Sequence, residues 1–402
     1  MIQIFLLILV FSAWQSFGQI NNLDAVSDSL VKDIPPDVNL VWLGESHGTK
    51  LNTELAFEWF QKLDQKRKVD YLLLESGFLD GEELNRFMAT GDSTILIRKM
   101  HKHGGTFEWT KEKYQYYLNI FRSQKDKPVS ERTRFIGIDI AHDFWNYHAF
   151  IRDSILPRFQ VDSSLAISRF PARLSNFADY QNYYRSLNED IQNKDLFYRK
   201  KFAGDYERLW YLVRNVHFLF LSKSASSSGR WNQVRDSLIY ENFKVFQARI
   251  DFKNSCSFAF WGQDHVLQEK SKSNTEFISC RIKKNNPELK QYSCYLLYSK
   301  STFNLPAFFI PKALRIFFGK KPYVKTAGLN NDKIFVRLSG TRYLKKKCSK
   351  NQNYCFFSTA SLPDRYDYLR RQKGISNRAY VQSVVLIRNS LASQPLQNWK
   401  RK

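Results

Sequence analysis

The sequence places a carboxylate and an imidazole two residues apart, Glu45 and His47, just after the apolar run Leu40–Leu43. If that run is a buried parallel strand, the residues after it project into the crevice where α/β proteins bind ligands. A histidine there can act as a general base on water, while the carboxylate fixes its tautomer and stabilises its cation. Gly44 and Gly48 on either side permit a tight turn. The pair therefore predicts acid–base chemistry at a strand end.

Two further polar residues follow apolar runs in the same way. Glu75 comes directly after Tyr71–Leu74, and His265 follows Phe258–Trp261 after three intervening residues. An unpaired buried carboxylate is costly, so a glutamate at the end of a buried strand is a candidate for function. We therefore predict one catalytic site built from four residues at strand ends, namely His47, Glu45, Glu75 and His265.

The same residue types could instead hold a divalent metal that activates water, so the sequence leaves two kinds of site open. The metal ligands would then be His47, Glu75 and His265. The chain contains no Gly-x-Ser-x-Gly elbow, no His-Glu-x-x-His helix and no phosphate-binding glycine loop. Serine hydrolysis of the usual kind is therefore disfavoured.

Short apolar runs separated by helical segments must position these residues. The predicted strands are Leu40–Leu43, Tyr71–Leu74, Phe135–Ile138, Phe258–Trp261, Tyr295–Leu297, Ile334–Val336 and Val384–Ile387. Apolar spacing predicts a helix over 51–68, and residues 180–250 form a helical insertion interrupted by a loop at Ser222–Gly229. Strands spaced by helices imply a mainly parallel sheet. The predicted fold class is α/β, a mainly parallel central sheet flanked by helices.

The two halves of the chain resemble each other weakly. The segment Val41–His47 resembles Phe258–His265, and about thirty residues later Tyr71–Ser76 resembles Tyr295–Ser299. Because two such echoes occur in the same order, we predict pseudo-duplicated halves.

The first residues predict export. An apolar core over Ile4–Ala13 is about ten residues long, too short for a membrane span of ~20, and Ser16 and Gly18 occupy the −3 and −1 positions of a cleavage site. The predicted organisation is a signal peptide at 1–18, an α/β domain at 19–396 with its helical insertion at about 150–250, and a basic tail at 397–402. The protein is expected to be periplasmic or secreted.

Five cysteines in an exported chain cannot all pair. Cys348 and Cys355 bracket a short polar loop and form the predicted disulfide. Cys280 and Cys294 are a candidate second pair, and Cys256, inside an apolar run, is expected to be a buried free thiol.

The net charge of +24 is concentrated in the last third, where residues 251–402 hold 29 Lys and Arg against 8 Asp and Glu. Such an excess favours association with an anionic surface or is simply a solvated basic surface. No RNA- or DNA-binding motif accompanies it, so nucleic acid is not an expected partner. The oligomeric state is left open.

At the candidate site the sequence resembles the erythromycin esterase family. The matching motifs, in order, are Leu43–Thr49, Leu74-Glu75, Glu83–Phe87, Trp109–Glu112, Arg134–Asp139, Arg235–Asn242, Trp261–Val266 and Tyr380–Leu396. They cover roughly residues 38–396. By resemblance, His47 is the general base, Glu45 and Glu75 shape it, and His265 supports water or substrate. Asp139 and Arg235 contact substrate or the catalytic side chains.

The resemblance implies hydrolysis of an ester or lactone, and its wider superfamily includes metal-dependent peptidases and haem-binding lipoproteins. The predicted function is therefore an exported hydrolase that activates water at a Glu/His site against an ester, lactone or related carbonyl. No cofactor is required in this interpretation. The alternatives are a metal-dependent peptidase or amidase, with a divalent metal as cofactor, and a non-catalytic binder of an envelope ligand.

The signal peptide gives the first testable prediction. Cleavage after Gly18 should leave Gln19 as the new N-terminus. Intact-mass spectrometry of the protein from its native envelope measures this directly, and a mass that still includes residues 1–18 would contradict it.

Overall fold

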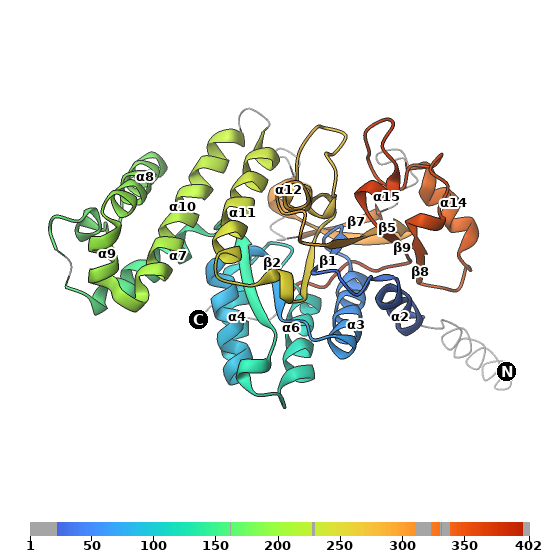
Figure 1. Ribbon diagram of the computed structural model, residues 1–402, viewed down its shortest axis with the longest axis horizontal. Helices are drawn as coiled ribbons and strands as arrows, with labels where there is room; N and C mark the ends of the chain where they lie inside the picture. Colours follow the sequence, from blue (N-terminus) through green and yellow to red (C-terminus); the bar gives the residue numbers. More distant parts are fainter. Residues whose placement is uncertain are drawn as a thin grey trace, which may run out of the picture. The chain divides into compact units, whose positions relative to one another are not determined.

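The computed structural model describes residues 22–160, 162–226, 230–310, 323–329, 331 and 338–396 (Figure 1). The predicted signal peptide, the tail at 397–402 and the predicted strand Ile334–Val336 lie outside these residues. The chain divides into two compact units. Unit 1 comprises residues 1–70, 103–133 and 252–402, and unit 2 comprises residues 71–102 and 134–251.

Unit 1 is built on five strands in the order β4-β1-β5-β9-β8. Their bounds are β4 (Ser257–Gly262), β1 (Leu40–Glu45), β5 (Gln291–Ser299), β9 (Ser383–Arg388) and β8 (Tyr354–Ser358). Neighbours from β4 to β9 are parallel, whereas β8 runs antiparallel to β9. Strands β1, β4 and β9 are buried along their whole length, which explains their continuous apolar runs. The predicted α/β class with a mainly parallel sheet is confirmed.

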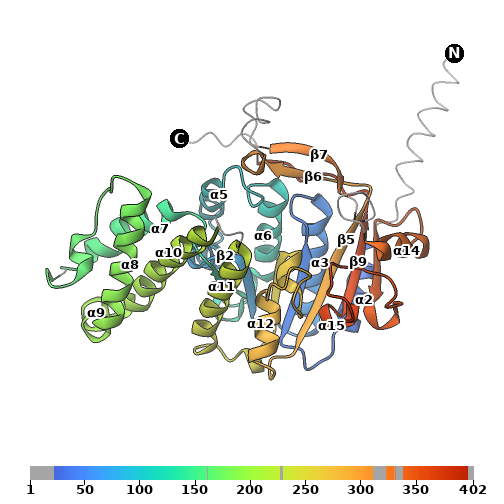
Figure 2. The ribbon, with the colours of Figure 1, turned by 90° about the horizontal axis from the view of Figure 1, so that it is seen from above.

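Helices cover both faces of this sheet (Figures 1 and 2). The helices of unit 1 are α2 (Leu23–Asp33), α3 (Lys50–Lys66), α6 (Lys111–Gln124), α12 (Ile278–Asn285), α14 (Ser339–Lys347) and α15 (Asn377–Tyr380). A separate antiparallel hairpin joins β6 (Ser301–Pro306) to β7 (Tyr323–Leu329). The predicted helix over 51–68 is confirmed as α3.

Successive side chains of a strand point to opposite faces of the sheet, and this alternation decides which helix each side chain contacts. Phe258 packs edge-on against Trp59 of α3, and Phe260 packs against Tyr116 of α6. Because Glu45 is in register with Gly262, two residues beyond Phe260, its side chain points to this α3/α6 face. Trp42 points to the opposite face, where its Nε1 donates to the Gln291 side chain, which also accepts from Ser279 of α12.

Unit 2 has two parallel strands, β2 (Tyr71–Gly77) and β3 (Arg134–Asp139), and is otherwise helical. Its helices are α4 (Phe78–Thr90), α5 (Ser93–Lys102), α7 (Phe144–Phe150), α8 (Phe177–Asn193), α9 (Asp195–Phe202), α10 (Tyr206–Ser226) and α11 (Trp231–Gln247). Aromatic and aliphatic side chains of α7, α8, α9 and α10 form one buried cluster. The helical insertion is therefore confirmed, although α10 extends to Ser226, beyond the predicted loop start at Ser222.

The cysteines agree with the sequence prediction in part. Cys348 and Cys355 form a disulfide, and Cys256 is a buried free thiol, as expected. The candidate pair of Cys280 and Cys294 is wrong, because both are buried free thiols on different elements, α12 and β5. Burial raises the pKa of the Cys280 thiol to about 11, so it is protonated at neutral pH.

Within the described ranges, no helix combines the length and the apolar character needed to cross a membrane.

Close backbone packing in unit 2 gives a stability prediction. A Cβ added at Gly137 of β3 would lie 2.1 Å from the carbonyl oxygen of Gly77, whereas one added at Gly204 would meet nothing within 4 Å. Because backbone cannot yield as a side chain can, Gly137→Ala should destabilise the protein by about 1–3 kcal/mol. Urea unfolding measures the change, and Gly204→Ala is the matched control, expected within about 0.5 kcal/mol of wild type. Equal free energies of unfolding for the two variants would contradict the close contact between Gly137 and the Gly77 carbonyl.

Candidate functional site

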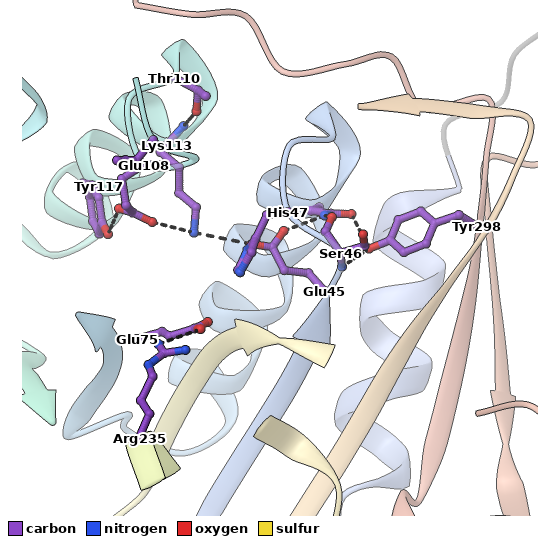
Figure 3. A network of polar contacts seen from close by, with 12 residues as sticks. Glu45, Ser46, His47, Glu75, Glu108, Thr110, Lys113, Tyr117, Arg235 and Tyr298 are labelled. Atoms are coloured by element: carbon purple, nitrogen blue, oxygen red, sulfur yellow. Dashed lines mark hydrogen bonds and ion pairs between the residues drawn. The ribbon is translucent and has the colours of Figure 1, made fainter. Parts of the chain in front are cut away.

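The C-terminal end of β1 carries a buried carboxylate in contact with a histidine (Figure 3). His47 Nδ1 lies 2.9 Å from Glu45 Oε1. The Glu45 side chain is 3% exposed and that of His47 is 31% exposed, so the carboxylate lies beneath an imidazole that solvent reaches. An ionised carboxylate only accepts hydrogen bonds, so the Nδ1–H of His47 is the donor. Nε2 therefore carries the lone pair of the neutral ring.

A closed set of hydrogen bonds fixes the chain where it leaves β1. Asn52 Nδ2, in the first turn of α3, donates to Glu45 Oε2 at 2.5 Å and to the Ser46 carbonyl at 2.8 Å. Tyr298, from β5, donates to Asn52 Oδ1 at 3.0 Å and accepts from the Ser46 amide at 2.9 Å. Burial, with Glu45 nearby, raises the pKa of Tyr298 well above its usual value, so its hydroxyl stays a donor. Both oxygens of Glu45 thus accept a hydrogen bond, Oε1 from His47 and Oε2 from Asn52.

The turn after His47 depends on glycine and on an aromatic neighbour. Gly48 has φ +89°, and a Cβ there would lie 2.5 Å from the Asn304 carbonyl oxygen of β6. Only glycine meets both conditions without strain. The His47 ring lies 5.1 Å, centroid to centroid, from the ring of Phe107. The turn and this contact hold the imidazole over Glu45.

Helix α6 brings a cation to the same carboxylate. Thr110 caps α6 by accepting from the Lys113 amide at 3.2 Å, and Lys113 Nζ lies 3.7 Å from Glu45 Oε1. The same Nζ lies 3.3 Å from Glu108, whose other oxygen accepts from Tyr117 at 3.0 Å. Lys113 thus offsets the charge of two carboxylates that are mostly withdrawn from water.

Unit 2 has its own charged cluster at the ends of β2 and β3. Regular pairing of these strands is interrupted between Leu74 and Gly77, and Glu75 lies in this irregular segment. Arg235 of α11 donates to Asp139 at the end of β3. It also donates to Glu75 Oε1 at 3.2 Å (Figure 3). The structure thus brings together three predicted residues, Glu75, Asp139 and Arg235.

His142 completes this second cluster. Its Nε2 lies 2.8 Å from Asp139 Oδ2, and its side chain is 36% exposed while that of Asp139 is fully buried. Burial alone would raise the pKa of Asp139, but Arg235 and His142 outweigh it and hold that pKa well below the usual value. Asp139 is therefore an ionised acceptor for both partners. Each unit thus carries a histidine on a buried carboxylate.

His265 lies elsewhere than the sequence predicts. After β4 the chain turns into a short 3-10 helix, Gln263–Val266, and Val266 covers the face of Gly44 that points away from Glu45. The His265 ring is buried, with ring contacts to Trp261 and Phe277 on that same side. The structure therefore does not bring His265 into the Glu45–His47 contact. The sequence similarity between the β1 and β4 segments is therefore not matched in structure beyond the ends of these strands.

The described residues contain no group of side chains that would support the metal-site alternative. Among the described residues, no three His, Cys, Asp or Glu side chains are grouped so as to hold a metal ion. Of the three predicted ligands, His47 contacts Glu45 and Phe107, whereas His265 contacts Trp261 and Phe277.

Sequence reasoning missed several residues of both clusters. Lys113 and Tyr298 come from elements far along the chain. Asn52 is only seven residues from Glu45, but no local pattern marks it. His142 had a signal, because it follows the strand-end residue Asp139 by three positions. Glu45 and His47 are arranged in a similar way, two positions apart.

The chain resembles several solved structures in its fold. Neither a family model nor a curated protein sequence matches the chain. Among solved structures, a succinoglycan biosynthesis protein matches with a TM-score of 0.64 at 12% identity, over 91% of each chain. A Bacillus cereus protein matches with a TM-score of 0.59 at 14% identity, over 94% of this chain and 100% of the other.

A mutant of the erythromycin esterase EreC, in its open conformation, matches with a TM-score of 0.62 at 12% identity. The match covers 94% of this chain and 98% of the esterase. At such identity the likeness concerns the fold. The chain therefore has an erythromycin esterase-like α/β fold, as its motifs predicted.

Proposed function

We propose that the protein is a hydrolase that attacks an ester or lactone carbonyl with water activated at His47. The observation that carries this proposal is the 2.9 Å contact between His47 Nδ1 and the buried Glu45. It combines an imidazole that solvent reaches with a carboxylate that orients it, which is the arrangement of a general base.

The proton path follows from the tautomer. Nε2 of His47 accepts a proton from water as the water oxygen bonds to the carbonyl carbon, and the imidazolium then returns a proton to the departing alkoxide oxygen. Glu45 stabilises the imidazolium formed in between, because its charge lies next to Nδ1–H. Asn52 and Lys113 hold Glu45 in place during this cycle.

Two further observations support the proposal. The fold likeness to the erythromycin esterase EreC favours a carbonyl substrate of the ester or lactone class. The disulfide between Cys348 and Cys355 favours an oxidising compartment, and so supports export by the proposed signal peptide at 1–18.

The test begins with purified residues 19–402, screened against ester, lactone and peptide libraries with and without chelator. An ester or lactone should be hydrolysed, and the rate should persist in chelator. On that substrate, His47→Ala should lower kcat by about 10²–10⁴-fold, the usual contribution of a positioned acid–base group. Glu45→Gln should also slow turnover, because the imidazolium loses its stabilising charge.

His217→Ala is the matched control, since His217 lies partly buried on α10 and takes no part in the proposed site. It should keep wild-type turnover. Full turnover by His47→Ala, or activity confined to peptides and abolished by chelator, would contradict the proposal.

A further inference from the structure

Helix α14 presents a strongly basic outer surface. Its sequence from Ser339 to Lys347 contains four cations and no acidic residue. Arg342, Lys346 and Lys347 are exposed, and within the described residues they make no ion pair with a carboxylate. With Arg365, in the segment that packs beside the helix, these side chains form what we call the basic face.

The rest of α14 is fixed to the sheet of unit 1. Thr341 and Leu344 are fully buried, and a Cβ at Gly340 would meet the ring of Tyr368. At the helix end, the disulfide to β8 and a hydrogen bond from Arg388 to the Ser349 carbonyl tie down the chain. The basic face is therefore carried by a well-anchored helix.

Two tyrosines hold two of the four cations, Lys347 and Arg365, in position. The rings of Tyr343 and Tyr366 stack with centroids 4.8 Å apart. Lys347 Nζ lies 5.8 Å from the Tyr343 ring and the Arg365 guanidinium lies 5.1 Å from the Tyr366 ring. Cation–π attraction of this kind orders long side chains that would otherwise move freely. The result is a column of two rings with a cation at each.

Another basic helix of unit 1 shows a different arrangement. On α12, Lys283 pairs with Glu269 at 2.7 Å, and Lys284 pairs with Glu276 at 3.1 Å. Asp367, the carboxylate two residues after Arg365, pairs with Arg371 at 2.8 Å and not with a cation of the basic face. Carboxylates thus neutralise Lys283 and Lys284 of α12 locally, whereas no carboxylate of the described residues pairs with the basic face.

We propose that the basic face binds an acidic polysaccharide, a chain of sugars whose repeats carry carboxylate or sulfate groups. Four exposed cations, two of them held on aromatic rings and none paired with a carboxylate of the described residues, complement a row of anions. Nucleic acid is a poorer fit, because each tyrosine already stacks on the other tyrosine and on a cation, whereas base recognition needs open aromatic faces. Insertion into a membrane interface is also a poorer fit, since it needs exposed apolar side chains. The exposed large apolar residues lie elsewhere in the described chain.

The test measures binding of labelled polygalacturonate oligomers by anisotropy in 20 mM salt, with neutral dextran as the control polymer. Arg342→Gln/Lys346→Gln should weaken binding about tenfold through the loss of two charge contacts. Lys283→Gln/Lys284→Gln removes the same net charge from α12 and should change binding less than twofold. Salt at 1 M should abolish binding by screening.

Three outcomes would overturn the proposal. Equal weakening by the α12 and α14 variants would mean a diffuse charge effect. Absence of polygalacturonate binding at 20 mM salt would remove the ligand class. Tighter binding to single-stranded DNA, or to vesicles containing phosphatidylglycerol, would assign the basic face to another partner. Unchanged urea midpoints of both variants keep folding out of the comparison.

Discussion

The structure around β1 depends on one constraint, the burial of the Glu45 carboxylate. A buried charge is costly unless hydrogen bonds and opposite charge compensate it. Asn52 and His47 supply the hydrogen bonds, and Lys113 supplies the charge. These partners come from α3, the turn after β1, and α6, so satisfying a single carboxylate fixes how three segments meet at the strand end. The same requirement leaves His47 with a defined tautomer at the surface.

In the second cluster, other residues compensate a buried carboxylate. Asp139 is fully buried, and Arg235 compensates its charge by contacting both carboxylate oxygens, while His142 also contacts Oδ2. The low pKa of Asp139 means that its contribution to stability is present above the unfolded-state pKa of about 4 and is lost as the pH falls further. Pairing a strand-end carboxylate with a nearby histidine is thus a feature of both units. In each, the carboxylate is buried and the imidazole meets solvent.

Much of the fold could be predicted because buried parallel strands appear as continuous apolar runs. The same reasoning placed Glu45 beside His47, since two residues beyond a strand end remain close in space. It did not place His265, because a short 3-10 helix turns that residue against Trp261 and Phe277, and apolar patterning does not encode such a turn. Lys113 was out of reach for a different reason: its contact with Glu45 depends on how α6 packs against the sheet.

The central claim is that Glu45 holds His47 with its proton on Nδ1, and heteronuclear NMR of the ¹⁵N-labelled imidazole tests this directly. If Glu45 accepts from His47, then once the ring is neutral its signals should be those of a protonated Nδ1 and an unprotonated Nε2. Glu45→Gln should remove this preference. A neutral His47 that carries its proton on Nε2 in the wild-type protein would contradict the account.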